Sequence, residues 1–125
     1  MSATAAQTAV LSGPKSVVER GSEDYPERFL RCGSPPDRLY VIGDVTVLRM
    51  PSLSVVGARK ATPYGRGCAR RFSTLAAARG LVIVSGGARG CDSEAHRAAI
   101  AEGAPTVAFL GGGCDRIYPA ENAAL

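Results

Sequence analysis

Three short apolar runs alternate with two amphipathic segments in the second part of the chain. The runs at 53–57, 81–85 and 106–110 have the length and composition of buried strands. Between them lie 62–79 and 92–103, where apolar residues recur every three to four positions. Strands that alternate with helices over short connections favour right-handed crossovers and a parallel sheet. We therefore predict an α/β fold with three adjacent parallel strands and flanking helices.

The two helical segments carry their own start and stop signals. Thr62 and Pro63 are typical of an N-cap and a first helical residue, and Gly80 is typical of a helix end. Asp92 is predicted to cap the second helix. The residues of the first helix that share one helical face, and that we expect to be buried, are Cys68, Phe72, Leu75 and Ala76.

The first part of the chain is less regular. Residues 1–22 are small and polar and show no period, so we predict a poorly ordered leader there. Residues 23–50 read as a lead-in segment, with a short helix at 25–31 and a strand at 39–43. The half domain with the parallel sheet then covers 51–125.

The positive charge is concentrated in the second part of the chain. The net charge is +4, and residues 51–125 hold nine basic and five acidic side chains, whereas residues 1–50 hold six of each. The basic residues between positions 58 and 97 are Arg59, Lys60, Arg66, Arg70, Arg71, Arg79, Arg89 and Arg97. Such a segment favours a polyanionic partner. A solvated helix face is the alternative, with Arg66 and Arg70 on a row that faces solvent.

Composition argues against several classes of protein. No apolar run approaches the roughly 20 residues of a membrane span, and the N-terminus lacks the regions of a signal peptide. We expect a cytoplasmic protein without a membrane partner. The cysteines and the single His96 show no zinc-ligand spacing, so neither a metal nor a cofactor is predicted. Asp92 and His96 are expected to be structural, and no catalytic residue is predicted.

A glycine-rich loop follows each predicted strand, at 57–60, 85–92 and 111–116. Ligands of open parallel sheets bind beyond the carboxyl ends of the strands. Glycine allows close approach of an anion, and Arg59, Lys60 and Arg89 add positive charge at this edge. The predicted phosphate-binding residues are Gly57, Arg59, Lys60, Ser85, Gly86, Gly87, Arg89, Gly111 and Gly112.

Three side chains near these loops each allow two interpretations. The Ser85 hydroxyl could contact a phosphate or cap the turn that follows its strand. Tyr64 and Tyr118 could stack on bases, or they could be ordinary packing residues. The backbone N–H groups of Gly86 and Gly87 are expected to lie between Arg59 and Arg89, where they would donate to a phosphate.

The loops and their surroundings also resemble the signature blocks of a known family. Residues 55–65 read VVGARKATPYG, residues 84–92 read VSGGARGCD, and residues 107–122 read VAFLGGGCDRIYPAEN. In order and spacing these blocks are similar to those of the DNA-processing protein A family, also called DprA/Smf. The resemblance covers about residues 24–125.

The resemblance implies a partial Rossmann-like fold and a function. Members of this family bind single-stranded DNA in natural transformation and load a RecA-type recombinase, so a non-enzymatic DNA-binding role is expected here. Arg59 and Arg89 would grip the strand, and a homodimer would be the oligomeric form. Ala58, Gly87 and Cys91 stand where the family has serine, an apolar residue and isoleucine. The family's domain also continues well beyond residue 122.

Two alternatives use the same phosphate loops. One is a nucleotide-binding sensor, which the anion loops would suit equally well. The other is a phosphoribohydrolase-like enzyme of the related lysine-decarboxylase-like Rossmann group. That group carries a Pro-Gly-Gly-x-Gly-Thr loop and a catalytic glutamate, whereas this chain has Gly111-Gly-Gly-Cys-Asp-Arg116 at the equivalent place, which argues against hydrolysis.

Overall fold

The computed structural model describes residues 11–114, 119 and 122, and it contains two small sheets. Strands β1 (Lys15–Glu19) and β2 (Arg38–Ile42) pair antiparallel as a hairpin. The second sheet is parallel, with the order β3-β4-β5. Its strands are β3 (Ser52–Ser54), β4 (Val82–Ser85) and β5 (Thr106–Ala108). The predicted parallel sheet is therefore confirmed, with β4 at its centre.

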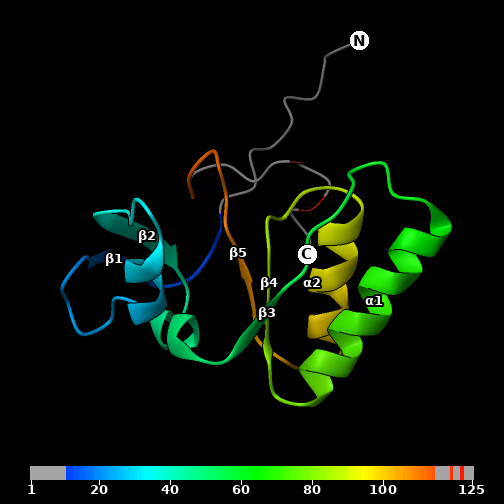
Figure 1. Ribbon diagram of the computed structural model, residues 1–125, viewed down its shortest axis with the longest axis horizontal. Helices are drawn as coiled ribbons and strands as arrows, with labels where there is room; N and C mark the ends of the chain where they lie inside the picture. Colours follow the sequence, from blue (N-terminus) through cyan, green and yellow to red (C-terminus); the bar gives the residue numbers. More distant parts are fainter. Residues whose placement is uncertain (1–10, 115–118, 120–121, 123–125) are drawn as a thin grey trace, which may run out of the picture.

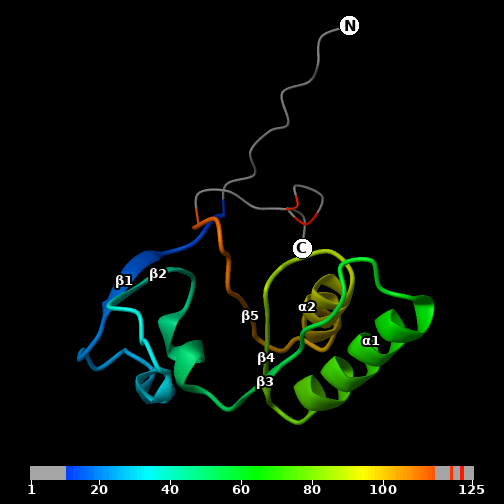
Figure 2. The same cartoon turned by 45° about the horizontal axis from the view of Figure 1, so that its top comes forward.

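Helices and hairpin lie on opposite sides of the parallel sheet (Figures 1 and 2). Helix α1 (Pro63–Ala78) joins β3 to β4, and helix α2 (Cys91–Ala101) joins β4 to β5. Both pack on one side because crossovers of one hand between successive strands turn to the same face. The hairpin and two 3-10 helices, η1 (Glu27–Arg31) and η2 (Val45–Arg49), lie on the other side.

Small side chains form the contact between the two helices. The core cluster contains Ala76 and Ala77 of α1, Ile83 of β4, and Ala95 and Ala99 of α2. Side chains this short allow the helices to approach each other and the sheet closely.

The predicted buried face of α1 is wrong for its larger members. Phe72 is 61% exposed and Leu75 is 45% exposed, whereas Ala76 is buried. The buried row instead contains Ala69, Ser73, Ala76 and Ala77. It is rotated from the predicted row because only small residues fit against the alanines of α2.

The predicted leader is wrong where it overlaps β1. Residues 15–19 pair with β2, and Val18 between them is buried. A salt bridge joins Glu19 to its cross-strand partner Arg38, with 3.2 Å between the charged atoms. Residues 1–10 lie outside the described part of the chain. The short helix predicted at 25–31 is the 3-10 helix η1.

The lead-in segment packs against the side of the parallel sheet that faces away from the two helices. The Phe29 ring lies 5.9 Å from the Phe109 ring, centroid to centroid. The Arg28 guanidinium donates to Ser52 Oγ at 2.7 Å and to the Met50 carbonyl at 2.6 Å. The hairpin also contacts the chain after β5, since Cys114 Sγ donates to the Tyr40 carbonyl of β2 at 3.4 Å.

The predicted start of α1 is confirmed and that of α2 is wrong. Thr62 caps α1, since its hydroxyl accepts from the Gly65 N–H at 3.1 Å. Gly80 follows α1 with a φ of +81°. The N-cap of α2 is Gly90, and Asp92 is the second residue of that helix. No helix in residues 11–114 is long and apolar enough to cross a membrane.

His96 of α2 is buried between the helix and the sheet. Thr106 Oγ1 donates to the Ile83 carbonyl at 2.8 Å, so it accepts from His96 Nδ1 at 2.7 Å. His96 Nε2 has no hydrogen-bond partner among the described residues. Burial lowers the pKa of His96 from its usual 6.5, an effect that the nearby Asp92 carboxylate partly opposes.

The protein should lose stability as the pH falls below neutrality. A lowered pKa in the folded state means that the unfolded chain binds the proton more tightly. The contribution of His96 is therefore complete above its unfolded pKa of 6.5, and it is lost as the pH falls from there through the folded pKa. His96→Gln keeps a donor for Thr106, and its melting temperature should fall less between about pH 7.5 and about pH 5.5. Because His96 is the only histidine, equal slopes in the two proteins would contradict this assignment.

Candidate functional site

A cleft opens at the carboxyl end of the parallel sheet. The loops after β3, β4 and β5 all lie at this end (Figure 1). The cleft has a volume of about 570 Å³. Its lining residues are Arg59, Lys60, Ala61, Arg66, Arg89, Gly90, Ser93, Arg97 and Asn122. The cleft thus combines the first two loops with parts of both helices.

The first two loops touch each other, and two glycines make the contact possible. The Cys91 N–H donates to the Ala58 carbonyl at 3.3 Å. A Cβ on Gly57 would lie 2.6 Å from Cys91 Sγ. Gly90 has a φ of +77°, and a Cβ there would lie 2.6 Å from the Arg59 carbonyl oxygen. The contact therefore brings Arg59 and Arg89 into one cleft.

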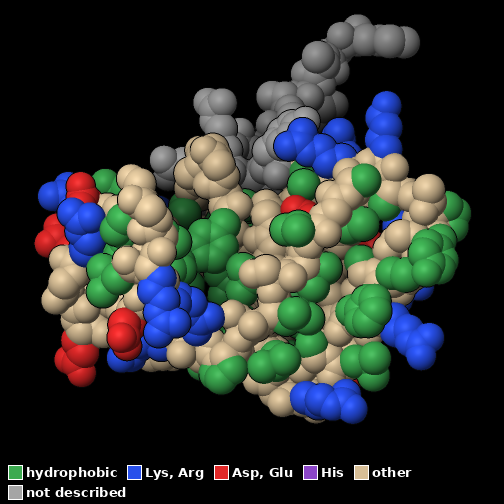
Figure 3. All heavy atoms as spheres, in the orientation of Figure 1, with side chains coloured by type: hydrophobic (Ala, Val, Ile, Leu, Met, Phe, Trp, Pro, Cys, Tyr) green, Lys and Arg blue, Asp and Glu red, His purple; other side chains and the backbone are tan. Residues whose placement is uncertain are grey.

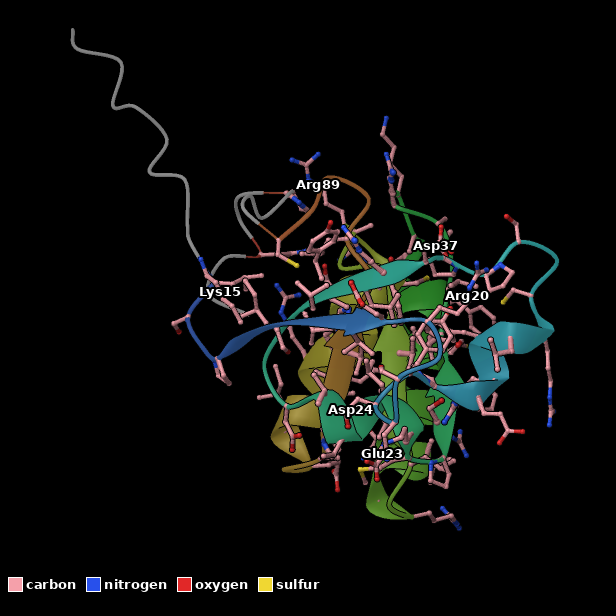
Figure 4. All side chains as sticks on the ribbon, turned by 90° about the vertical axis from the view of Figure 1, so that its left-hand side faces the viewer. Lys15, Arg20, Glu23, Asp24, Asp37 and Arg89 are labelled. Atoms are coloured by element: carbon pink, nitrogen blue, oxygen red, sulfur yellow. The ribbon has the colours of Figure 1, made fainter. Side chains whose placement is uncertain are left out.

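Five cationic side chains line the cleft: Arg59, Lys60, Arg66, Arg89 and Arg97. Lys and Arg side chains lie at this upper end of the molecule and at other places on the face shown in Figure 3. Arg89 lies at the upper edge in Figure 4, whereas Glu23 and Asp24 lie toward the opposite edge. Within the described residues, Arg59, Lys60 and Arg97 form no salt bridge. This end therefore carries a strong positive potential.

Glu94 of α2 anchors the arginines of α1. Its carboxylate lies 3.9 Å from Arg66 and 3.1 Å from Arg70, and its side chain is only 13% exposed. The prediction that Arg66 and Arg70 face solvent is correct only in part, because both reach across to α2. Arg66 is thereby held at the wall of the cleft.

In the second loop, residues 85–92, two backbone N–H groups donate to a side chain of the same loop. Asp92 Oδ2 accepts from the Gly86 N–H at 3.2 Å and from the Ala88 N–H at 3.3 Å. The expectation that the Gly86 N–H is directed at a bound phosphate is therefore wrong. Asp92 supplies the negative charge that these donors would otherwise attract. The charged groups that line the cleft are side-chain cations.

The carbonyl groups of the same loop are held from the other side. Asn122 Nδ2 donates to the Gly87 carbonyl at 2.9 Å, to the Ala88 carbonyl at 3.3 Å and to Ser93 Oγ at 2.8 Å. Ser93 Oγ in turn donates to the Ala88 carbonyl at 2.6 Å. Side chains thus bind both the N–H groups and the carbonyl groups of the loop that carries Arg89.

The predicted site residues have different places in this arrangement. Arg59, Lys60 and Arg89 line the cleft together. Ser85 is buried, and its hydroxyl donates to the Val55 carbonyl at 2.6 Å, so it holds the chain after β3 and does not cap the turn that follows β4. Gly57, Gly86 and Gly87 shape the loops beneath the cleft.

Other predicted residues lie away from the cleft or cannot be placed. Gly111 and Gly112 are exposed and are not among the lining residues. Tyr64 is 82% exposed and also lies outside the lining. Tyr118 lies outside the described residues.

Four polar residues of the lining were not predicted from the sequence: Arg66, Ser93, Arg97 and Asn122. Ser93 and Arg97 lie one helical turn apart on α2, so a helical wheel that began at the second loop could have found them. Nothing in local sequence places Asn122 there, because the residue reaches the cleft only through the tertiary fold.

Comparison with known proteins identifies the family of this chain. The sequence profile described as DNA recombination-mediator protein A matches residues 16–125. The chain belongs to this family, which includes the DprA and Smf proteins. The resemblance noted in the sequence is therefore confirmed.

Curated members of the family are similar along most of the chain. Protein Smf of Escherichia coli K12 is 38% identical over 109 residues, which cover 87% of this chain and 29% of Smf. DNA processing protein DprA of Bacillus subtilis is 35% identical over 111 residues, covering 88% of this chain and 37% of DprA. The chain thus spans only about a third of the length of these relatives.

Two solved DprA structures share the fold. The X-ray structure from Streptococcus pneumoniae is 31% identical with a TM-score of 0.80, and the match covers 86% of this chain and 38% of that one. The Helicobacter pylori protein is 32% identical with a TM-score of 0.75, over 89% of this chain and 49% of that one. Its structure is described as showing a single-stranded DNA binding mode. The predicted Rossmann-like fold is confirmed by these neighbours.

The contact between the loops of this DprA/Smf chain should depend on Gly90. Gly90→Ala places a Cβ against the Arg59 carbonyl at a positive φ, so we expect it to lower the free energy of unfolding by about 2 kcal/mol or more. Gly67 lies inside α1 with open space where a Cβ would stand, and Gly67→Ala should raise stability by about 0.5–1 kcal/mol. Urea denaturation measures both changes, and a neutral Gly90→Ala would argue against the loop contact.

Proposed function

We propose that this chain binds single-stranded DNA through its phosphates in the cationic cleft. The observation that carries the proposal is the convergence of Arg59, Lys60, Arg66, Arg89 and Arg97 on one open cleft. Arginine suits this task because its planar guanidinium can donate two hydrogen bonds to one phosphate. The binding mode named for the Helicobacter pylori relative supports DNA as the source of these phosphates.

The composition of the cleft favours binding that is independent of base sequence. Specific readout requires side chains that reach base edges with matched donors and acceptors. The cleft is lined by cations whose natural partners are phosphate oxygens, and by Ser93 and Asn122. Ser93 donates to a backbone carbonyl, and Asn122 donates to backbone carbonyls and to Ser93 Oγ. Strands of any sequence should therefore bind with comparable affinity.

The wider role that we propose is that of a non-enzymatic, cytoplasmic DNA-handling protein. The family description names recombination mediation, so loading of a RecA-type recombinase during DNA uptake and natural transformation belongs to the proposal, as does a homodimer. Neither Asp92 nor His96 is among the residues that line the cleft. Asp92 accepts hydrogen bonds from two backbone N–H groups, and His96 is buried and bonded to Thr106. These contacts support structural roles for Asp92 and His96.

Arg59, Arg89 and Arg97 should each be required for affinity. Replacing any of them with alanine should weaken binding of a fluorescein-labelled oligothymidine about tenfold or more, because a charge-assisted hydrogen bond contributes roughly 1.5–3 kcal/mol. Fluorescence anisotropy measures the dissociation constant. The melting temperature of the Arg59 and Arg97 variants should hardly change, since exposed cations add little to stability.

Arg79→Ala is the matched control, because Arg79 caps the far end of α1, where its guanidinium donates to the Leu75 carbonyl. It should bind as the parent does. If the cleft variants bind as tightly as the parent, or if Arg79→Ala weakens binding as much as they do, the cleft is not the binding site. Equal affinity for ATP and the oligonucleotide would instead favour a nucleotide sensor.

Affinity should fall steeply as salt is added. Each phosphate that the cleft neutralises contributes a slope of about −0.7 to the plot of log affinity against log salt concentration. Arg97→Ala should therefore make the slope shallower by about that amount, while Arg79→Ala leaves it unchanged. Titrations at several salt concentrations measure the slopes. An affinity that does not respond to salt would contradict phosphate binding.

A further inference from the structure

We propose that Asn122 is a positioning residue, which holds the loop of Arg89 in the conformation that binds the phosphates. This inference rests on the proposed function of the cleft. Asn122 is 8% exposed, and it belongs to the lining while its amide faces the second loop. It arrives from the part of the chain after β5, more than thirty residues beyond the loop that it holds.

The hydrogen bonds define the orientation of the Asn122 amide. All three partners of Nδ2 are oxygens, and two of them are carbonyl oxygens, which can only accept. Ser93 Oγ gives its own proton to the Ala88 carbonyl, so it accepts from Asn122 as well. Only the NH2 group of the amide satisfies these partners. An ionised carboxylate at this position would face the two carbonyl groups without a proton to donate.

Asn122 and Asp92 together fix the backbone on the N-terminal side of Arg89. The Ala88 N–H donates to Asp92, and the Ala88 carbonyl accepts from both Asn122 and Ser93. On the C-terminal side, Gly90 is packed against the first loop at a positive φ. The residues on both sides of Arg89 are therefore held in place, and Asn122 is the support that comes from the part of the chain after β5.

The chain after β5 contributes to the cleft through Asn122 and not through the glycines predicted there. Gly111 and Gly112 were predicted to touch the phosphate, but they are not in the lining. Asn122 lies outside the predicted loop at 111–116 and reaches the cleft through its side chain.

A double-mutant cycle separates positioning from general stability. Asn122→Ala should weaken binding of labelled oligothymidine about fivefold, because part of the contribution of Arg89 is lost when its loop is released. In an Arg89→Ala background the same change should have almost no further effect. In the Arg79→Ala background it should again weaken binding about fivefold. Asn122→Ser keeps a shorter donor and should lie between parent and Asn122→Ala.

Hydrogen exchange provides the second readout. The amides of Gly86 and Ala88 should exchange faster in Asn122→Ala, since the loop that carries them has lost one of its supports. An unchanged affinity in Asn122→Ala overturns the inference, as does an equal loss in the parent and Arg89→Ala backgrounds. If Arg89→Ala itself binds like the parent, the proposed function fails, whereas unchanged exchange in Asn122→Ala would refute the structural part of the inference alone.

Discussion

The arrangement of the cleft depends on the close contact between the loops after β3 and β4. Parallel strands bring their carboxyl ends to one edge of the sheet, but they do not by themselves bring two arginine-bearing loops together. Here the chain passes Gly57 and Gly90 at distances that no side chain could occupy, and a backbone hydrogen bond from Cys91 to Ala58 closes the contact. Arg59 and Arg89, thirty residues apart in sequence, become neighbours as a result.

The two sides of the molecule use charge differently. On the hairpin and lead-in side three arginines pair with carboxylates: Arg20 with Asp37, Arg38 with Glu19, and Arg49 with Asp24. Around the cleft, within the described residues, Glu94 is the one carboxylate that pairs with a lining arginine. Paired charges exert little field at a distance, so the three pairs of the hairpin side add little to the positive field of the protein.

Periodicity predicted the order of the elements well and the orientation of α1 poorly. The predicted stripe of Cys68, Phe72 and Leu75 and the observed stripe of Ala69, Ser73 and Ala76 have the same spacing and differ by one residue. A pattern of apolar positions cannot choose between two such rows, because the choice depends on the small side chains presented by α2. Strand β1 was missed for a similar reason, since its sequence has no marked alternation and its pairing depends on β2.

The site was predictable where it follows from local chain geometry and unpredictable where it follows from competition for hydrogen bonds. Arg59 and Arg89 could be found because they sit beside glycines at strand ends. The use of the Gly86 N–H could not be predicted, because Asp92 was expected to be the N-cap of α2. The helix starts two residues earlier, with Gly90 as its N-cap, and the Asp92 carboxylate accepts from the loop instead.

That internal carboxylate changes the physical basis of binding. A free helix N-terminus would offer directed backbone donors, which contribute at any salt concentration and favour one fixed phosphate position. With the N–H groups of Gly86 and Ala88 already satisfied by Asp92, the proposed binding would rest mainly on the cationic side chains of the cleft. A set of side-chain cations fixes the position of a phosphate less strictly than directed backbone donors do. This property suits the proposed binding of strands of any sequence.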